Sequence, residues 1–132
     1  MNFENLTDHP IVLEQVDGSL KTLPPSGTVA RVERRSIDVG IVRDLDVFLV
    51  EDEYGDVVWL PPPKLGTVNV VSRMVAEHAP RRRDLVFPAH LIRDGGRIIR
   101  ARALGQIARP ENAALRAFQR AWQDLGRCRA RQ

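Results

Sequence analysis

The sequence predicts an α+β protein: a mainly antiparallel β-sheet of about six to eight strands, with one short strand-helix-strand unit and a C-terminal helix. Three observations predict this class. Short β-branched runs are separated by turn residues such as Asp17 and Gly18, which is typical of antiparallel hairpins. One β-branched run leads directly into Ser72, a residue type favoured at helix N-caps. A last segment after Pro110 carries apolar residues at helical spacing.

The first hairpin is expected to pair residues 11–16 with residues 19–23 through a two-residue turn. This register places Glu14 opposite Lys21, and a cross-strand pair of opposite charge stabilises such a hairpin. The segment 24–27, Pro-Pro-Ser-Gly, ends the second strand because proline cannot donate to a strand ladder.

Further strands are expected before the middle of the chain. Residues 28–34 form one of them, and residues 46–51 and 57–60 form a second hairpin with its turn at 53–56. The proline run 61–63 then acts as a stiff, extended connector that ends the antiparallel part.

The next segment predicts the strand-helix-strand unit. Residues 67–71 form a β-branched strand, Ser72 caps a helix over 73–79, and residues 85–87 form the following strand. The residues between the strands are about the dozen that a parallel crossover requires. An antiparallel arrangement with a laterally packed helix satisfies the same pattern, so both alternatives stay open.

A further hairpin joins residues 90–93 to residues 97–104 through Asp-Gly-Gly at 94–96. Side chains alternate between the two faces of its second strand. The face expected to point inward carries small and apolar residues: Ile99, Ala101 and Ala103.

The chain has the length of one domain, in two parts. Residues 1–109 are expected to form a compact β-rich α+β domain, and residues 110–132 a C-terminal amphipathic helix with a basic tail. This helix either docks on the sheet of its own chain or forms a homo-oligomer through residues 110–126. Its narrow apolar stripe consists of Leu115, Phe118, Trp122 and Leu125.

Charge divides the chain into an acidic and a basic half. Residues 1–72 hold 6 Lys and Arg against 12 Asp and Glu, whereas residues 73–132 hold 14 Arg against 5 acids, so a net charge of −6 precedes one of +9. The basic half attracts anions. The expected partner is therefore an anionic small molecule, nucleotide-like in its chemistry, with nucleic acid as a second class of partner.

Composition excludes several classes of protein. The apolar content of 43% and the charged content of 28% are those of a globular chain, not of a disordered or fibrous one. No apolar run reaches the roughly 18 residues of a membrane helix, and the N-terminus lacks the pattern of a signal peptide, so we expect a cytoplasmic protein without membrane contact. The single cysteine, Cys128, excludes an internal disulfide and a cysteine-based metal site.

The N-terminal segment carries three hydrogen-bonding side chains in alternate positions. Strand periodicity places Asn5, Thr7 and His9 on one face. These residues either contact the base or sugar of a ligand, or tie down the N-terminal strand while Pro10 turns the chain. Both interpretations stay open.

Anion-binding side chains gather in the second half of the chain. Ser72 and Arg73 open a helix where free backbone N–H groups favour phosphate, and Asn69 can contribute from the strand; a simple serine cap is the alternative. The three arginines at 81–83 form either part of a basic groove or a solvated loop. The expected ligand-binding residues are Asn5, Thr7, His9, Asn69, Ser72, Arg73, His90, Arg93, Arg97 and Arg100.

The sequence favours a non-catalytic protein over an enzyme. Its histidines have no metal-binding spacing, no serine lies in a nucleophile elbow, and the acids at 51–56 lack the ligand order of a calcium loop. No catalytic residue, metal or cofactor is therefore expected. His9 and His90 stay open as the acid or base of a metal-independent nucleotide hydrolase.

Five blocks of the sequence form a series: Asn5-Leu-Thr-Asp-His-Pro10, Leu23-Pro-Pro-Ser-Gly27, Val29-Ala-Arg-Val32, Gly66-Thr-Val-Asn-Val-Val-Ser-Arg-Met-Val-Ala-Glu-His-Ala-Pro80 and Arg82-Arg-Asp-Leu-Val-Phe-Pro88. In this order they resemble small bacterial and phage proteins that begin with an NLTPHP-type motif. The resemblance extends from Asn5 to Leu104. The chain departs from it at Asp8, where proline is common, and in the helix added after Pro110.

The phage setting of such proteins implies an analogy with phage anti-defence sponges of the Thoeris anti-defence type, which sequester cyclic nucleotide signals. The leading hypothesis is a small binding protein that holds a phosphate-bearing ligand in an arginine-lined pocket, at a subunit or sheet-helix junction. A nucleic-acid-associated or protein-interaction module is the first alternative. A metal-independent nucleotide hydrolase is the second.

Overall fold

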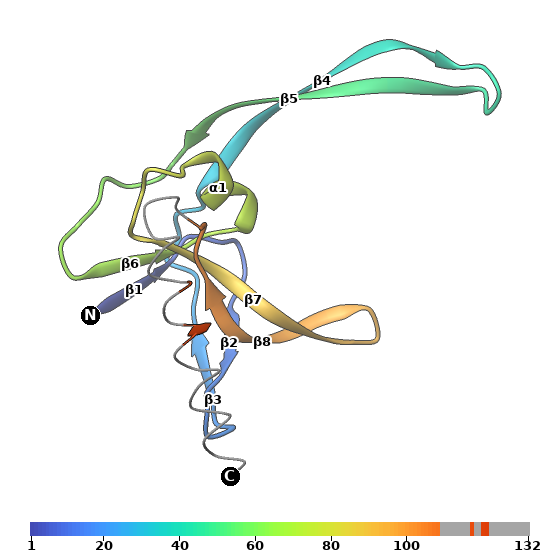
Figure 1. The fold of residues 1–132 in the computed structure, drawn as a ribbon. Coiled ribbons are helices and arrows are strands. Elements are labelled where there is room, and N and C mark those ends of the chain that lie inside the picture. The colour runs from blue at the N-terminus through green and yellow to red at the C-terminus, as the bar shows by residue number, and fades with distance from the viewer. Residues whose placement is uncertain (109–116, 118–119, 122–132) are drawn as a thin grey trace.

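The protein is mostly β. The computed structural model describes residues 1–108, 117 and 120–121. Strands take up 54% of the structure and helix 8%, and the body is a six-stranded sheet that nearly closes into a barrel (Figure 1). The predicted α+β class is therefore wrong, because helix α1 (Arg73–His78) has only six residues and forms no layer against the sheet.

The sheet of the body is mixed, with parallel strand pairs beside the antiparallel ones that the sequence predicts. Its strands are β1 (Asn2–Asn5), β2 (Ile11–Glu14), β3 (Leu20–Leu23), β6 (Thr67–Val70), β7 (Leu85–Asp94) and β8 (Arg97–Gly105). They follow the order β1-β6-β7-β8-β2-β3. The pairs β1–β6, β6–β7 and β2–β8 are parallel, whereas β7–β8 and β2–β3 are antiparallel.

A short contact between the two end strands of this order nearly closes the barrel. Asn5 of β1 and Pro25, just after β3, form an isolated parallel bridge. The Ser26 N–H donates to the Asn5 carbonyl at 2.9 Å. Because Pro25 has no N–H, it cannot donate at this seam, and the ladder does not extend.

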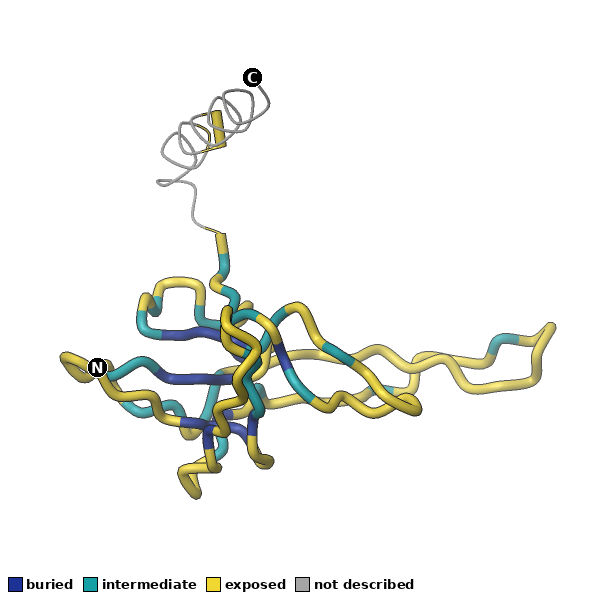
Figure 2. The backbone as a smooth tube through the Cα atoms, turned by 90° about the horizontal axis from the view of Figure 1, so that it is seen from below, coloured by how far each residue is buried: buried dark blue, intermediate teal, exposed yellow. Residues whose placement is uncertain are grey.

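Strands β4 (Arg31–Val42) and β5 (Val47–Val58) form a two-stranded antiparallel arm that projects from the body (Figures 1 and 2). The predicted hairpin with a turn at 53–56 is wrong, because those residues lie within β5. The turn falls at 43–46, where Asp46 has a φ of 53°. Aspartate tolerates this left-handed conformation better than most residues.

The β2–β3 hairpin has a longer turn than predicted. Glu14 lies opposite Leu20, so the predicted pair with Lys21 is wrong. The Asp17 carboxylate accepts hydrogen bonds from the N–H and the hydroxyl of Ser19, at 3.0 and 2.6 Å, which stabilises the wider loop. Glu14 pairs with arginines of β8 instead.

Helix α1 lies between β6 and β7 in the chain. Ser72 is its N-cap, because the serine hydroxyl accepts a hydrogen bond from a backbone N–H of the first turn. β6 and β7 pair in parallel, Asn69 with Leu85 and Val70 with Val86, which decides between the two arrangements that the sequence left open. The two strands are neighbours within the barrel sheet and do not form a separate strand-helix-strand unit.

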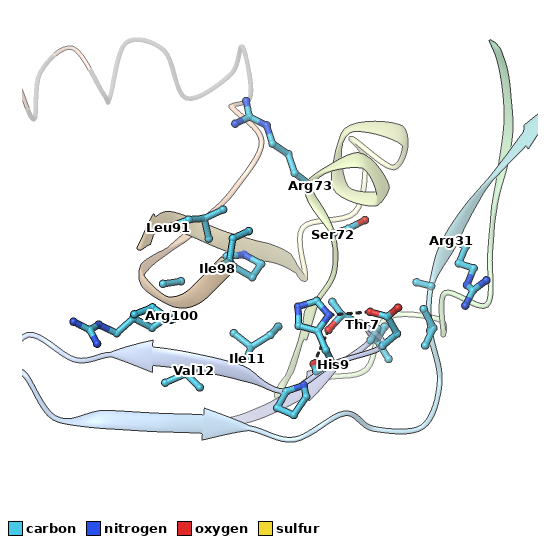
Figure 3. A pocket seen from close by; sticks show the side chains of 18 residues that line it. Thr7, His9, Ile11, Val12, Arg31, Ser72, Arg73, Leu91, Ile98 and Arg100 are labelled. Carbon is cyan, nitrogen blue, oxygen red and sulfur yellow. Dashed lines mark hydrogen bonds and ion pairs between the residues drawn. The ribbon is translucent and has the colours of Figure 1, made fainter. Parts of the chain in front are cut away.

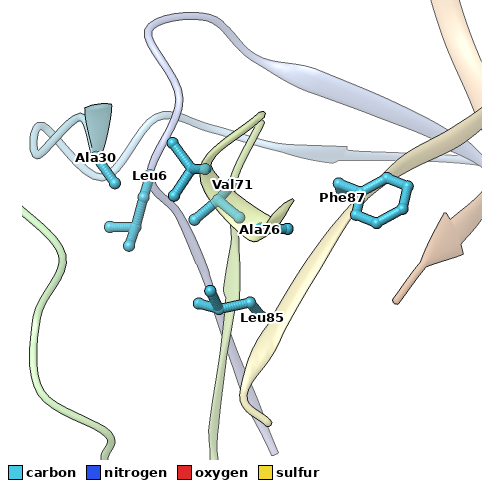
Figure 4. Packing of buried hydrophobic residues seen from close by; sticks show 7 residues of the cluster. Leu6, Ala30, Val71, Ala76, Leu85 and Phe87 are labelled. Carbon is cyan, nitrogen blue, oxygen red and sulfur yellow. The ribbon is translucent and has the colours of Figure 1, made fainter. Parts of the chain in front are cut away.

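Side-chain alternation along β6 and β7 divides the core into two clusters. On one side of the sheet, Val70 and Val86 pack with Ile11 and Leu23. The second cluster lies on the other side, where α1 covers it (Figure 4), and consists of Leu6, Ala30, Val71, Val75, Ala76, Leu85 and Phe87. Leu6 and Ala30 thereby anchor the loop after β1 and the segment before β4.

The β7–β8 hairpin is confirmed, with Asp94 opposite Arg97 across the glycine turn. We call this hairpin the β7–β8 ribbon. Ala101 is buried, as expected for the inner face, whereas Ile99, which the alternation places on the same face, is 40% exposed and lies at a shift in the β7–β8 register. The shift interrupts the side-chain alternation, and the ribbon extends beyond the body towards its tip (Figure 1).

The predicted C-terminal helix and its oligomer contact through 110–126 lie outside the described residues, apart from positions 117, 120 and 121. The division into 1–109 and 110–132 stays a prediction for the same reason. Within the described part of the chain, no helix has the length and apolar character needed to cross a membrane.

Candidate functional site

A groove of about 570 Å³ opens where several segments of the body meet (Figure 3). The loop 6–10 and the start of β2 form one wall. The segment 29–31 that leads into β4 and the residues that open α1 form a second wall. The β7–β8 ribbon forms a third. The groove therefore depends on the tertiary fold and not on a single sequence motif.

The floor of the groove is apolar. Leu6 and Ile11 line it, and both are buried members of the core, so core packing holds this surface in place. Leu91, Ile98 and Ala101 make the wall formed by the β7–β8 ribbon apolar as well. A surface of this kind favours burial of an apolar or aromatic ring.

Asn5 holds the loop 6–10 from beneath the groove. It is 2% exposed, and its amide nitrogen donates to the carbonyls of Leu23 and His9 at 2.9 and 3.0 Å. Its side-chain oxygen accepts from the Thr7 N–H at 3.0 Å and from the Thr7 hydroxyl at 2.6 Å. These contacts use all the hydrogen bonds that the amide offers. Asn5 therefore shapes the loop and has no bond left for a ligand.

Thr7 and His9 line the groove, although they lie in a loop and not on the predicted strand face. His9 is exposed, and its Nδ1 lies 2.8 Å from Asp8 Oδ1. The hydrogen bond with His9 is the main cause that lowers the pKa of the Asp8 carboxyl below its ordinary value. Among the described lining residues, Asp8 is the one carboxylate, and it is already engaged.

Three arginines from three elements line the outer part of the groove, and their side chains point in different directions: Arg31, Arg73 and Arg100 (Figure 3). The Arg73 Nε donates to Glu77 Oε1 at 2.9 Å in an exposed pair. The Arg100 Nε lies 3.7 Å from Glu14 Oε1, beyond hydrogen-bond distance. This buried nitrogen has no hydrogen-bond partner among the described residues. The rim therefore carries positive charge that is only partly paired.

Half of the predicted ligand-binding residues come together in this groove, namely Thr7, His9, Ser72, Arg73 and Arg100. The sequence does not identify Arg31 as a site residue, because a strand expected over 28–34 gives no sign that it borders a groove. The available signal was its place within Val29-Ala-Arg-Val32, one of the blocks that carry the resemblance.

Asn69 does not reach the groove. It is 2% exposed, and its Nδ2 donates to Asp84 Oδ2 at 2.8 Å. Arg82 donates hydrogen bonds to the same carboxylate from Nε and Nη2, at 2.8 and 2.7 Å. Its Nη2 also donates to the Pro61 carbonyl at 2.8 Å. The hydrogen bonds from Arg82 are the main cause that lowers the pKa of Asp84, and the pKa of Arg82 rises in turn. Arg82, together with Asp84 and Asn69, thus connects the proline segment 61–63 to the body.

His90, Arg93 and Arg97 also lie outside the groove. All three are exposed on the β7–β8 ribbon, which extends away from the body (Figure 1). The φ of 49° at His90 marks a local irregularity in β7. The predicted arginine-lined pocket therefore contains Arg73 and Arg100 but not the two arginines near the ribbon tip.

Among the described residues, no group of three or more His, Cys, Asp and Glu side chains could hold a metal ion. Comparison of the chain with protein-family models, with curated proteins and with solved structures yields no match. The resemblance to proteins with an NLTPHP-type motif therefore stays a prediction, and the groove itself supplies the argument about function.

Proposed function

We propose that this protein is a small non-catalytic binding protein whose groove holds a phosphate-bearing ligand of the nucleotide or cyclic nucleotide class. One observation carries the proposal: an apolar groove of about 570 Å³ has three arginines from separate elements at its rim. Small-molecule sites commonly have this size, with a mainly apolar lining and a few polar groups that orient the ligand.

The arginines supply the phosphate contacts in this proposal. A guanidinium group presents a planar fork of N–H donors that matches the oxygens of phosphate. The exposed pair of Arg73 with Glu77 contributes about 0–1 kcal/mol, so Arg73 can exchange the carboxylate for phosphate at little cost. Arg100 is partly exposed, and the donors at the end of its side chain can supply a further contact to phosphate.

The apolar lining of the groove supplies contacts to the ring system of the ligand. Leu91 and Ile98 are partly exposed and lie on the same ribbon as Arg100. A ligand with a base next to a phosphate can therefore cover apolar surface while its charge stays at the rim. A sponge for a nucleotide signal, which binds its ligand and returns it unaltered, is the biological form of this proposal.

A metal-independent nucleotide hydrolase is the second candidate, because the Asp8 carboxylate lies 2.8 Å from the His9 ring in the groove. A carboxylate in this position orients the imidazole, as general acid-base catalysis requires. The two candidates differ in outcome: a sponge releases the ligand intact, and a hydrolase releases product.

Mass spectrometry of small molecules tests the proposal directly. The protein is purified from cells with active nucleotide signalling, and its ligands are released by heat. We expect an intact phosphate-bearing molecule in near-stoichiometric amount. Recovered product favours the hydrolase, and the absence of any enriched anion contradicts both.

Variants locate the site within the proposed groove. Arg31→Ala removes one charge-assisted contact, which is worth about 1.5–3 kcal/mol, so affinity for the recovered molecule should fall roughly 10-fold to 150-fold in a calorimetric titration. Arg93→Ala is the matched control, because Arg93 is an exposed arginine outside the groove. Equal losses for both variants would contradict a site at the groove.

Salt dependence separates the proposal from the nucleic-acid alternative. Binding to a long polyanion weakens steeply with salt, because each neutralised phosphate releases counterions. A ligand held by three arginines should show a shallow dependence in the same buffer series. A steep slope with single-stranded or double-stranded nucleic acid, and no competition by mononucleotides, would favour the alternative.

A further inference from the structure

The outer part of the arm exposes an unusual amount of apolar surface. We define the distal arm as residues 36–53, the outer portions of β4 and β5 with the turn between them. Nothing in the described body packs against it, and it stands clear of the barrel (Figures 1 and 2). Seven large apolar side chains of the distal arm are 44–74% exposed: Val39, Ile41, Leu45, Val47, Phe48, Leu49 and Val50.

These side chains cover both faces of the distal arm. Ile41 lies opposite Phe48, and the adjacent pair Val42 and Val47 points to the other face. Both outer edges of the two strands also lack a neighbouring strand in the described structure. A two-stranded ribbon on its own is marginally stable in water, and open apolar edges are templates for pairing with another chain. The distal arm therefore has the properties of a docking element.

The charge of the distal arm indicates what it docks on. Residues 36–53 hold six acids and one arginine, a net charge of −5, whereas the rest of the chain carries +8. Two distal arms side by side would repel each other. The surface complementary to the distal arm is thus the basic remainder of another molecule of the same sequence.

The β7–β8 ribbon is the basic surface that best matches the distal arm. Its residues 85–105 hold four arginines and one aspartate, a net charge of +3. Leu91, Ile98 and Ile99 add apolar side chains that are 40–52% exposed. Within one molecule no strand pairing joins the arm to this ribbon, and the two project separately from the body (Figure 1).

We propose that the distal arm of one copy docks on the β7–β8 ribbon of a second copy of this chain, so that the protein is a homo-oligomer held by paired acidic and basic ribbons. Apolar contacts hold the two ribbons together, and opposite charge sets their orientation. Leu91 and Ile98 belong both to the ribbon and to the groove, so the docked arm would lie beside the mouth of the groove. This inference goes beyond the proposed function and does not depend on it.

Sedimentation velocity at tens of micromolar protein, without added ligand, tests the inference. We expect the wild-type chain to form a dimer or a larger closed assembly, and Phe48→Glu to shift it to monomer. Phe48 belongs to neither core cluster, so the thermal unfolding temperature of the variant should stay close to that of the wild type. Val16→Glu and Leu65→Glu are matched controls, because both side chains are fully exposed and lie outside the distal arm. They should leave the assembly intact.

Charge reversal tests the choice of partner surface. One variant carries Asp38→Arg, Glu51→Arg and Glu53→Arg, and a second carries Arg93→Glu and Arg97→Glu. Each variant alone should associate at least 10-fold more weakly than the wild type, because its two ribbons have charges of the same sign. An equimolar mixture should regain the assembly, because each arm then meets a ribbon of opposite charge.

Three outcomes would overturn the inference. The first is a wild-type chain that is monomeric at these concentrations. The second is an assembly that survives Phe48→Glu, since its interface would then lie elsewhere, as in the segment 110–126. The third is a mixture of the two charge-reversed variants that fails to associate.

Discussion

Asn5 is the residue on which the N-terminal wall of the groove depends. Its amide joins the end of β1, the end of β3 and the loop 6–10 through four hydrogen bonds, all made inside the protein. Burying a polar group is costly unless the group is hydrogen-bonded. Removal of this side chain therefore leaves several buried groups without a hydrogen-bond partner at once.

Asn5→Ala is therefore expected to lower the free energy of unfolding by about 2–4 kcal/mol, because each buried group left without a partner costs about 1–3 kcal/mol. Urea denaturation measures this loss. Asn2→Ala is the control, since Asn2 is exposed in the same strand, and it should change stability by less than about 0.5 kcal/mol. Equal effects for the two variants would contradict the role assigned to Asn5.

Asp84 makes stability depend on pH. Its pKa in the folded protein lies below the ordinary value of 3.8, chiefly because Arg82 donates to it. A lowered folded pKa stabilises the protein above the unfolded pKa, and this contribution disappears as pH falls through the folded pKa. Asp84→Asn should therefore cost about 1–3 kcal/mol at neutral pH, and the difference from wild type should shrink below about pH 4. Thermal unfolding across a pH series measures it, and a gap independent of pH would count against the ion pair.

Burial explains why some of the predicted ligand-binding residues line the groove and others do not. Asn5 and Asn69 have side chains that suit ligand binding, yet both are 2% exposed and bond within the protein. Residue type and spacing do not show whether an isolated polar side chain is buried. His9 and Arg73 differ because they are exposed, and they do line the groove.

At the scale of elements, the pairing of β7 with β8 near the core requires a glycine at position 105. Gly105 lies opposite Phe87, and the aromatic ring occupies the space where a Cβ would stand. A Cβ at position 105 would lie 2.5 Å from Phe87 Cε2, a distance at which the ring must move. Because Phe87 belongs to the core cluster beneath α1, that movement disturbs the packing.

Gly105→Ala is expected to destabilise the protein by about 1–3 kcal/mol through overpacking. Gly55→Ala is the matched control, because Gly55 also lies in a strand and its added Cβ would meet the flexible end of Glu33 at 3.3 Å. Denaturant unfolding of both variants checks the prediction. A neutral Gly105→Ala would show that Phe87 has room to shift.

The hairpins show which elements sequence can predict. The turn at Asp94-Gly95-Gly96 is correct because glycine at positive φ closes the ribbon there. The turn expected at 53–56 is wrong, because Gly55 lies within β5, which pairs with β4 on both sides of it. A glycine next to acidic residues looks like a turn locally, and only the long-range pairing of β4 with β5 overrides it.

For the whole molecule, the division of charge along the sequence becomes a division in space. The acidic half puts most of its excess on the distal arm, and arginines of the basic half lie on the β7–β8 ribbon and at the rim of the groove. Strand order could not be predicted, since the parallel pairs β1–β6 and β2–β8 join segments far apart in the chain. Side-chain alternation tells which residues face inward, but it carries no information on which strand is the neighbour.

The most direct test of the central claim, that the groove is the binding site, is a titration of ¹⁵N-labelled protein with a cyclic dinucleotide, with ADP and with inorganic phosphate, followed by NMR. We predict that at least one nucleotide shifts backbone signals of the groove wall, such as Thr7, His9, Ser72 and Ala101, and that Arg31→Ala weakens these shifts. Shifts scattered over exposed arginines such as Arg93 and Arg97, with the groove unchanged, would contradict the account.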